Sequence, residues 1–144
     1  MSATSSLDAS SPAGPAGTVL VELSIPVQAD LVVLARLTAA TVSGRAGFGV
    51  EDIEDLRLAV EELCLSIVHD GREGRLHLTF ECEPDVVTVS CRFDPPPGGA
   101  ARDGGETDDL SLRILDALVD EHGRSTQDGR PSGWLRKRRM LSPA

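Results

Sequence analysis

Aromatic residues are scarce in this chain. Its 144 residues include three phenylalanines, one tryptophan and no tyrosine, whereas apolar residues as a whole make up 40%. A core must therefore be built from aliphatic side chains, which suits helices packed on a sheet in an α/β protein. The length fits a single domain that is large enough to bury one good core.

Positive charge is also in short supply. The chain has 14 lysines and arginines against 23 acidic residues, a net charge of −9. Because phosphate binding relies on Lys and Arg, this balance argues against nucleic acid as the main partner. The one basic run, residues 136–139, would alternate between the two faces of a strand and form no single patch. The acidity indicates either a solvated surface or the attraction of a basic protein partner.

Long apolar runs and cysteine motifs are missing as well. No apolar run approaches the length of a membrane span, and no basic start followed by an apolar run marks a secretory signal. We therefore expect a cytoplasmic protein that binds no membrane. Cys82 and Cys91 are expected opposite Val87 and Leu78 in neighbouring strands, and with Cys64 they are interpreted as buried hydrophobes rather than a redox pair. Neither CxxC nor HxxxH occurs, so zinc is not expected.

Composition divides the chain into two parts. Residues 1–17 are dominated by Ser, Ala, Pro and Gly, which predicts a disordered tail. Residues 18–141 are expected to form one domain that begins with a strand over residues 19–25. A helix should follow over residues 31–43. Asp30 is the expected N-cap of this helix, and Gly44 is expected to end it. Its expected inner face consists of Leu34, Leu37, Thr38 and Val42.

Strict alternation of apolar and polar residues predicts a β-hairpin. Its strands would be Arg75–Glu83 and 86–93, joined by a tight turn, with His77 on the solvent-exposed face. After a long loop, a helix should begin at Asp108 or Asp109 and run to about Glu121, where His122 and Gly123 end it. Its expected apolar face is Leu112, Leu115, Leu118 and Val119. A short strand, a turn over D-G-R-P-S-G and a last strand over residues 134–141 complete the domain.

The most informative stretch is residues 50–70, which predict one amphipathic helix without Gly or Pro. Glu62 and Ser66 are four residues apart and therefore adjacent on one face. Leu58 and Leu65 lie close to Glu62, where they either form a partner-binding patch or are buried by the neighbouring helix. The core face of this helix is expected to carry Ile53, Leu56, Val60, Leu63 and Ile67.

Within this helix the run D-I-E-D-L-R-L-A-V-E-E-L-C-L-S-I-V-H resembles the nucleotide-site helix of bacterial anti-sigma factors that double as serine kinases. These proteins belong to the GHKL superfamily, with histidine kinases and gyrase-type ATPases. Their helix carries a Glu, an Asn four residues later and often a His three further on. Glu62 and His69 match this pattern, whereas Ser66 stands at the Asn position.

The resemblance covers roughly residues 19–141. It implies an α/β (α+β) fold of the GHKL ATPase type, a two-layer sandwich with a mixed, mostly antiparallel sheet and helices on one face. It also implies a homodimer. The later segment L-S-L-R-I-L-D-A-L-V-D-E, together with D-L-R-L-A-V-E-E-L-C, resembles the stress-response anti-sigma factors of actinobacteria.

The resemblance also implies an ATP or ADP site with Mg²⁺. Glu62 would be the catalytic base that activates the attacking group, and Ser66 would take the place of the Asn that holds the metal. Asp94 would stand for the Asp that reads adenine, although prolines follow it where the family has glycines. Alternatively, F-D-P matches the end of the family's first glycine segment and D-x-G-x-G is deleted. Glu62 is otherwise an exposed helix carboxylate.

The family's phosphate cradle, G-x-G-L, aligns with residues 109–112, which include Ser111. The carboxylates of Asp108 and Asp109 would then face the phosphates and repel them. Gly104 and Gly105 lie a little upstream and offer an alternative cradle, because phosphate approach needs backbone without side chains.

Two functions follow. In the first, the protein is an anti-sigma factor that sequesters an alternative sigma factor, is released by an anti-anti-sigma protein and has a degenerate ATP site. In the second, it is an ATP-dependent kinase that phosphorylates a serine of the anti-anti-sigma protein through Glu62.

Overall fold

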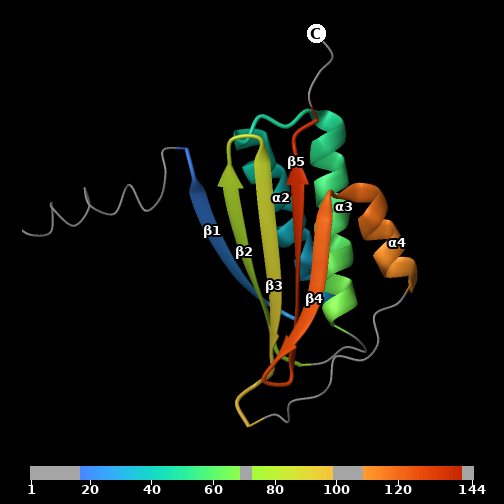
Figure 1. Cartoon of the computed structure of the whole chain (residues 1–144). Coiled ribbons are helices and arrows are strands. Elements are labelled where there is room, and N and C mark those ends of the chain that lie inside the picture. The colour runs from blue at the N-terminus through green and yellow to red at the C-terminus, as the bar shows by residue number, and fades with distance from the viewer. Residues whose placement is uncertain (1–16, 69–72, 99–108, 141–144) are drawn as a thin grey trace, which may run out of the picture.

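The computed structural model describes residues 17–68, 73–98 and 109–140. Figure 1 shows a five-stranded sheet with its helices on one side, which confirms the two-layer α/β prediction. Most of the predicted tail lies outside the described residues, as do His69, Gly104 and Gly105. The elements in chain order are β1 (Val19–Pro26), the 3-10 turn η1 (Ala29–Leu31), α2 (Val32–Arg45), α3 (Val50–Ile67), β2 (Arg75–Glu83), β3 (Val86–Asp94), α4 (Asp109–Leu118), β4 (Glu121–Gln127) and β5 (Arg130–Arg138).

The sheet has the strand order β1-β2-β3-β5-β4, and every neighbouring pair in it is antiparallel. The expectation of a mixed sheet was therefore wrong for the part of the chain described here. The reason lies in the connections. Two helices, α2 and α3, separate β1 from β2, so the chain reverses direction three times and the two strands run in opposite directions. Of the other neighbours, β2-β3 and β4-β5 are hairpins, whereas β3 is connected to β5 through α4 and β4.

The first hairpin has the register expected from the alternation. Cys82 pairs with Val87, and Leu78 pairs with Cys91. All three cysteines are buried and free of disulfide bonds. Asp85 takes a left-handed conformation, with φ of 69°, in the turn. His77 is only half-buried and lies 3.8 Å from a carboxylate oxygen of Glu22 on β1, so its predicted solvent exposure is only partial.

Helix α3 lies at the centre of the core. Four of its five predicted core residues are buried, and Ile53 is partly exposed. Gly133 on β5 allows this close packing, because a Cβ atom there would lie 2.8 Å from Cδ1 of Leu63. The helix ends at Ile67 and not at Asp70, since Val68 already takes an extended conformation.

Helix α2 differs from its prediction. Asp30 lies in the 3-10 turn and makes no capping hydrogen bond, and Gly44 lies inside the helix, which continues to Arg45. Leu34 and Leu37 are 39% and 53% exposed. Small side chains face inward in their place, which lets the helix approach its neighbours closely. The buried residues of α2 are Val32, Ala35, Ala39, Val42 and Ser43.

The C-terminal hairpin is longer than predicted. Helix α4 ends at Leu118, and the residues expected to end it, His122 and Gly123, belong to β4. Asp128 and Gly129 both have positive φ and form a two-residue turn. This turn type suits the twist of a hairpin, so β5 begins directly after it rather than at Trp134. Of the predicted apolar face of α4, Leu115 is buried within the helix, Val119 is buried just beyond its end, and the other two residues are partly exposed.

None of the helices in the described ranges combines the length and the apolar character needed to cross a membrane.

Candidate functional site

Glu62, the predicted catalytic residue, lies in a groove between α3 and α4. The groove has a volume of about 450 Å³. Within the described ranges, the Glu62 side chain forms no ion pair or hydrogen bond, whereas Oε1 of its neighbour Glu61 lies 3.2 Å from Nη1 of Arg36 on α2. The residues lining the groove are Leu58, Glu61, Glu62, Leu65, Ile114, Ala117 and Leu118.

Ser66 lies one turn further along α3 but does not line this groove. Its side chain is 7% exposed, and its Oγ donates a hydrogen bond to the carbonyl oxygen of Leu63 at 3.0 Å. Its hydroxyl proton is thus held by its own helix. The structure places the Glu62 carboxylate in the open groove and the Ser66 hydroxyl in the interior.

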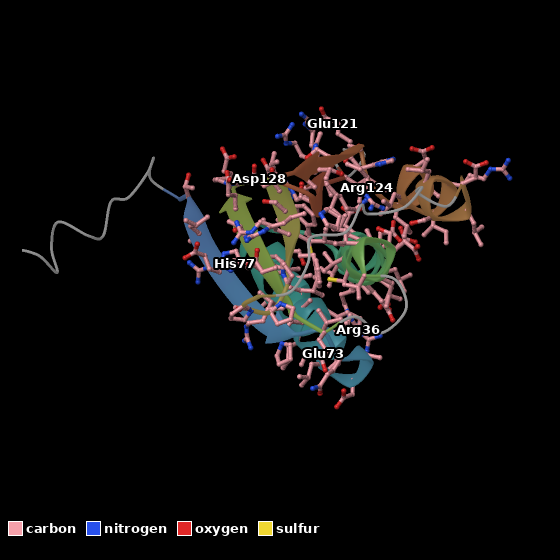
Figure 2. The ribbon with its side chains drawn as sticks, turned by 90° about the horizontal axis from the view of Figure 1, so that it is seen from below. Arg36, Glu73, His77, Glu121, Arg124 and Asp128 are labelled. Carbon is pink, nitrogen blue, oxygen red and sulfur yellow. The ribbon has the colours of Figure 1, made fainter. Side chains whose placement is uncertain are left out.

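Arg124 on β4 approaches the same turn of α3 from the sheet. Its Nη1 donates to the carbonyl oxygen of Ser66 at 3.0 Å. Figure 2 shows the side chain beside the end of α3. Helix C-termini carry partial negative charge, so this contact is electrostatically favourable. Burial lowers the pKa of the Arg124 guanidinium, which has no carboxylate partner among the described residues.

Asp94 lies apart from Glu62 and Ser66. Phe93 points into the core, and alternation along β3 turns Asp94 to the same face as Arg92, the face of the sheet without helices. Arg92 binds Asp94 with both Nε (2.9 Å) and Nη2 (3.2 Å), and Arg130 approaches at 3.3 Å. The hydrogen bond from Arg92 is the main reason that the pKa of Asp94 is lowered.

Ser111 is the third residue of α4 and is 4% exposed. Its Oγ has no hydrogen-bond partner within the described part of the chain. Asp109 occupies the first turn of this helix, so a carboxylate stands where the family alignment expects a glycine. The two glycines proposed as an alternative cradle lie outside the described residues.

The basic run near the C-terminus is paired with acidic residues. Lys137 is buried and donates to the carbonyl oxygen of Leu118, with Asp52 Oδ1 3.7 Å away. Arg136 and Arg138 point to the other face, where both bind Glu121 and lower its pKa. The predicted alternation is thus confirmed.

The comparison with known protein families matches residues 25–134 to the histidine kinase-like ATPase domain. The chain belongs to this family. It is also similar to serine-protein kinase RsbW of Bacillus cereus (strain AH187), with 46% identity over 72 residues, which are 48% of this chain and 45% of the relative. RsbW of Bacillus thuringiensis (strain Al Hakam) is 46% identical over 63 residues, 42% of this chain and 39% of the relative. The chain therefore spans less than half the length of these relatives, and the resemblance stated from the sequence is confirmed.

Within this histidine kinase-like ATPase domain, Arg124 is the site residue that sequence reasoning missed. The Asp-Gly pair at 128 and 129 carried the signal, because it predicts a two-residue hairpin turn. Counting back from that turn pairs Arg124 with Gly133. The turn expected at this point, D-G-R-P-S-G, spans six residues and therefore does not predict this strand register.

Proposed function

We propose that this protein is an anti-sigma factor of the stress-response type. It binds an alternative sigma factor of RNA polymerase in the cytoplasm and is countered by an anti-anti-sigma protein. Membership of the histidine kinase-like ATPase family and the similarity to RsbW support this assignment. Such binding requires only a surface, and the folded scaffold from β1 to β5 supports the proposal because it can present one even where the nucleotide elements are altered.

The observation that carries the proposal is the state of Ser66. Mg²⁺ in an ATP site needs an accessible oxygen ligand. The Ser66 hydroxyl is buried and bonded to the helix backbone, and the Arg124 guanidinium sits on the carbonyl of the same residue. Asp94, the candidate for adenine, is held by two arginines on the other face of the sheet. These residues do not fit Mg-ATP or Mg-ADP, so we infer a degenerate nucleotide site.

A thermal melt of the full chain with and without millimolar Mg-ATP or Mg-ADP tests this inference. A ligand at 100 times its Kd stabilises a protein by about 2.7 kcal/mol, which shifts the melting temperature by several degrees. We expect no shift. In parallel, each alternative sigma factor encoded in the same genome is mixed with the protein and analysed by size-exclusion chromatography. We expect one of them to co-elute, and no co-elution with any of them would contradict the anti-sigma assignment.

The second candidate is the serine-protein kinase. It is favoured by the Glu62 carboxylate, which lies in an open groove, has no partner among the described residues and is suited to accept a proton from a serine hydroxyl. A clear shift with Mg-ATP would favour this candidate. It would then require phosphate transfer to an anti-anti-sigma protein, abolished in Glu62→Ala.

We also propose that the protein is a homodimer. No described element covers the sheet face opposite the helices, and Trp134 is 36% exposed on it beside a hollow of about 270 Å³. Aromatic side chains at such positions commonly anchor interfaces.

A further inference from the structure

The groove between α3 and α4 has an apolar floor that the described residues leave partly exposed. Leu58 and Leu65 are 44% and 48% exposed, although α4 packs along the same helix. Burial by the neighbouring helix was one expectation for these leucines, and about half of each nevertheless remains exposed. The α4 side of the groove is also apolar and consists of Ile114, Ala117 and Leu118.

The dimensions of the groove suit a helix. Leu58 and Leu65 are two turns apart, about 10 Å along the axis of α3. Lys137 contacts both Leu118 at the end of α4 and Asp52 at the start of α3, so the two helices run antiparallel. A helix laid between them can place apolar side chains at positions i, i+3 or i+4, and i+7 in the groove.

The charge around the groove is negative. Glu61 and Glu62 lie between the two leucines, at three and four residues from Leu58, and both line the groove. Arg36 compensates Glu61, whereas within the described part of the chain Glu62 is unpaired. The whole chain carries a net charge of −9. An occupant with Lys or Arg beside its apolar stripe is therefore attracted by Glu62 when bound and by the net negative charge of the chain as it approaches.

Segments of the chain itself do not provide such an occupant. Residues 1–16 contain no Lys, Arg or His, and their large apolar residues are Met1 and Leu7. Residues 99–108 contain Arg102 but no large apolar residue. A second copy docked symmetrically would bring Glu62 close to the partner's identical acidic edge, which is repulsive.

We propose that the sigma factor docks one amphipathic helix, apolar on one face and flanked by Lys or Arg, into the groove between α3 and α4. This inference rests on the proposed anti-sigma function and adds the surface and the kind of segment that it binds. Leu58 and Leu65 are the apolar anchors, and Glu62 supplies the negative charge.

The test compares the double variant Leu58→Ala/Leu65→Ala with Leu37→Ala. Leu37 is a slightly more exposed leucine on α2 outside the groove, and alanine preserves helix propensity in all cases. Binding to the co-eluting sigma factor is measured by titration calorimetry. We expect the double variant to lose at least about tenfold in affinity, because buried apolar anchors dominate helix-in-groove binding. Leu37→Ala should bind like the wild type.

A second arm tests the charge. Glu62→Gln should weaken binding severalfold at low salt and less at high salt, since salt screens the attraction. Melting temperatures near that of the wild type show that the variants are folded. If the wild type binds the sigma factor and the double variant binds it equally well, the groove is not the docking site and the anti-sigma function stands. If no sigma factor binds the wild type, the proposed function and the groove assignment are both overturned.

Discussion

At the scale of single residues, the contacts of Asp94 and Arg124 bear most on function. Asp94 accepts hydrogen bonds from Arg92 and Arg130, so its carboxylate is engaged in an ion-pair cluster on the open sheet face. Arg124 places a cation on the last turn of α3. Both contacts are made between groups of the protein itself, as the proposed degenerate nucleotide site requires.

Replacing Asp94 with Asn should lower the free energy of unfolding by roughly 0.5–1 kcal/mol at neutral pH, because the cluster is partly exposed. The folded pKa of Asp94 is lowered, so its contribution is complete above the ordinary Asp pKa of about 3.9 and is lost as the pH falls through the lower folded value. Urea unfolding should show a larger difference between wild type and variant at pH 7 than near pH 3, where the contribution of Asp94 is already reduced.

The control for this measurement is Asp30→Asn. Asp30 is exposed and forms no ion pair with any residue of the described ranges. An equal change in the free energy of unfolding in both variants would show that the ion pairs of Asp94 with Arg92 and Arg130 do not stabilise the fold.

At the scale of the elements, the approach of α3 to the sheet organises the molecule. Leu63 and Ile67 pack over Gly133 so closely that there is no room for a methyl group at this position. Lys137 on β5 contacts Asp52 at the start of α3 and the carbonyl oxygen of Leu118 at the end of α4. The first contact brings α3 close to β5, and the contacts of Lys137 connect the start of α3 with the end of α4 beside the groove that contains Glu62.

The Gly133→Ala variant should be destabilised by about 1–3 kcal/mol, since the new Cβ would lie 2.8 Å from Leu63 and overpacking forces the helix away. Gly44→Ala is the matched control. It lies inside α2 with nothing within 4 Å of an added Cβ, and it should stabilise the protein by about 0.5–1 kcal/mol. Denaturant unfolding measures both, and an unchanged midpoint for Gly133→Ala would show that α3 is less closely packed than described.

At the scale of the whole molecule, the helical layer and the open sheet face offer two different surfaces. The groove between α3 and α4 is apolar with an acidic edge, whereas the sheet face combines hydroxyl groups, His77 and Arg92 with the exposed Trp134. Separate surfaces would allow the proposed self-association and the proposed partner binding to occur together.

Light scattering should accordingly give twice the 15.2 kDa mass of one chain. Trp134→Ala removes the aromatic anchor of the open face and should shift the protein toward the monomer at micromolar concentration. Leu37→Ala, on the helical layer, should leave the mass unchanged. A monomeric wild type, or a dimer indifferent to Trp134→Ala, would contradict self-association through this face.

The sequence by itself determined the features that depend on local periodicity. Alternation in residues 75–93 was sufficient for the β2-β3 register, down to the partners of Cys82 and Cys91. The apolar spacing in α3 identified its core face, and the resemblance of that helix indicated the family. These patterns are readable because side-chain direction repeats every two residues in a strand and every 3.6 in a helix.

Only the tertiary structure decided what each side chain meets. The contact of Arg124 with Ser66 joins residues 58 positions apart, and no local pattern encodes it. The inward face of α2 was set by the space beside α3, which admits alanines and excludes Leu34 and Leu37. The exposure of Leu58 and Leu65 depends likewise on how far α4 reaches over α3. Burial is a property of the assembled layers, so periodicity predicts which residues share a face but not how completely that face is covered.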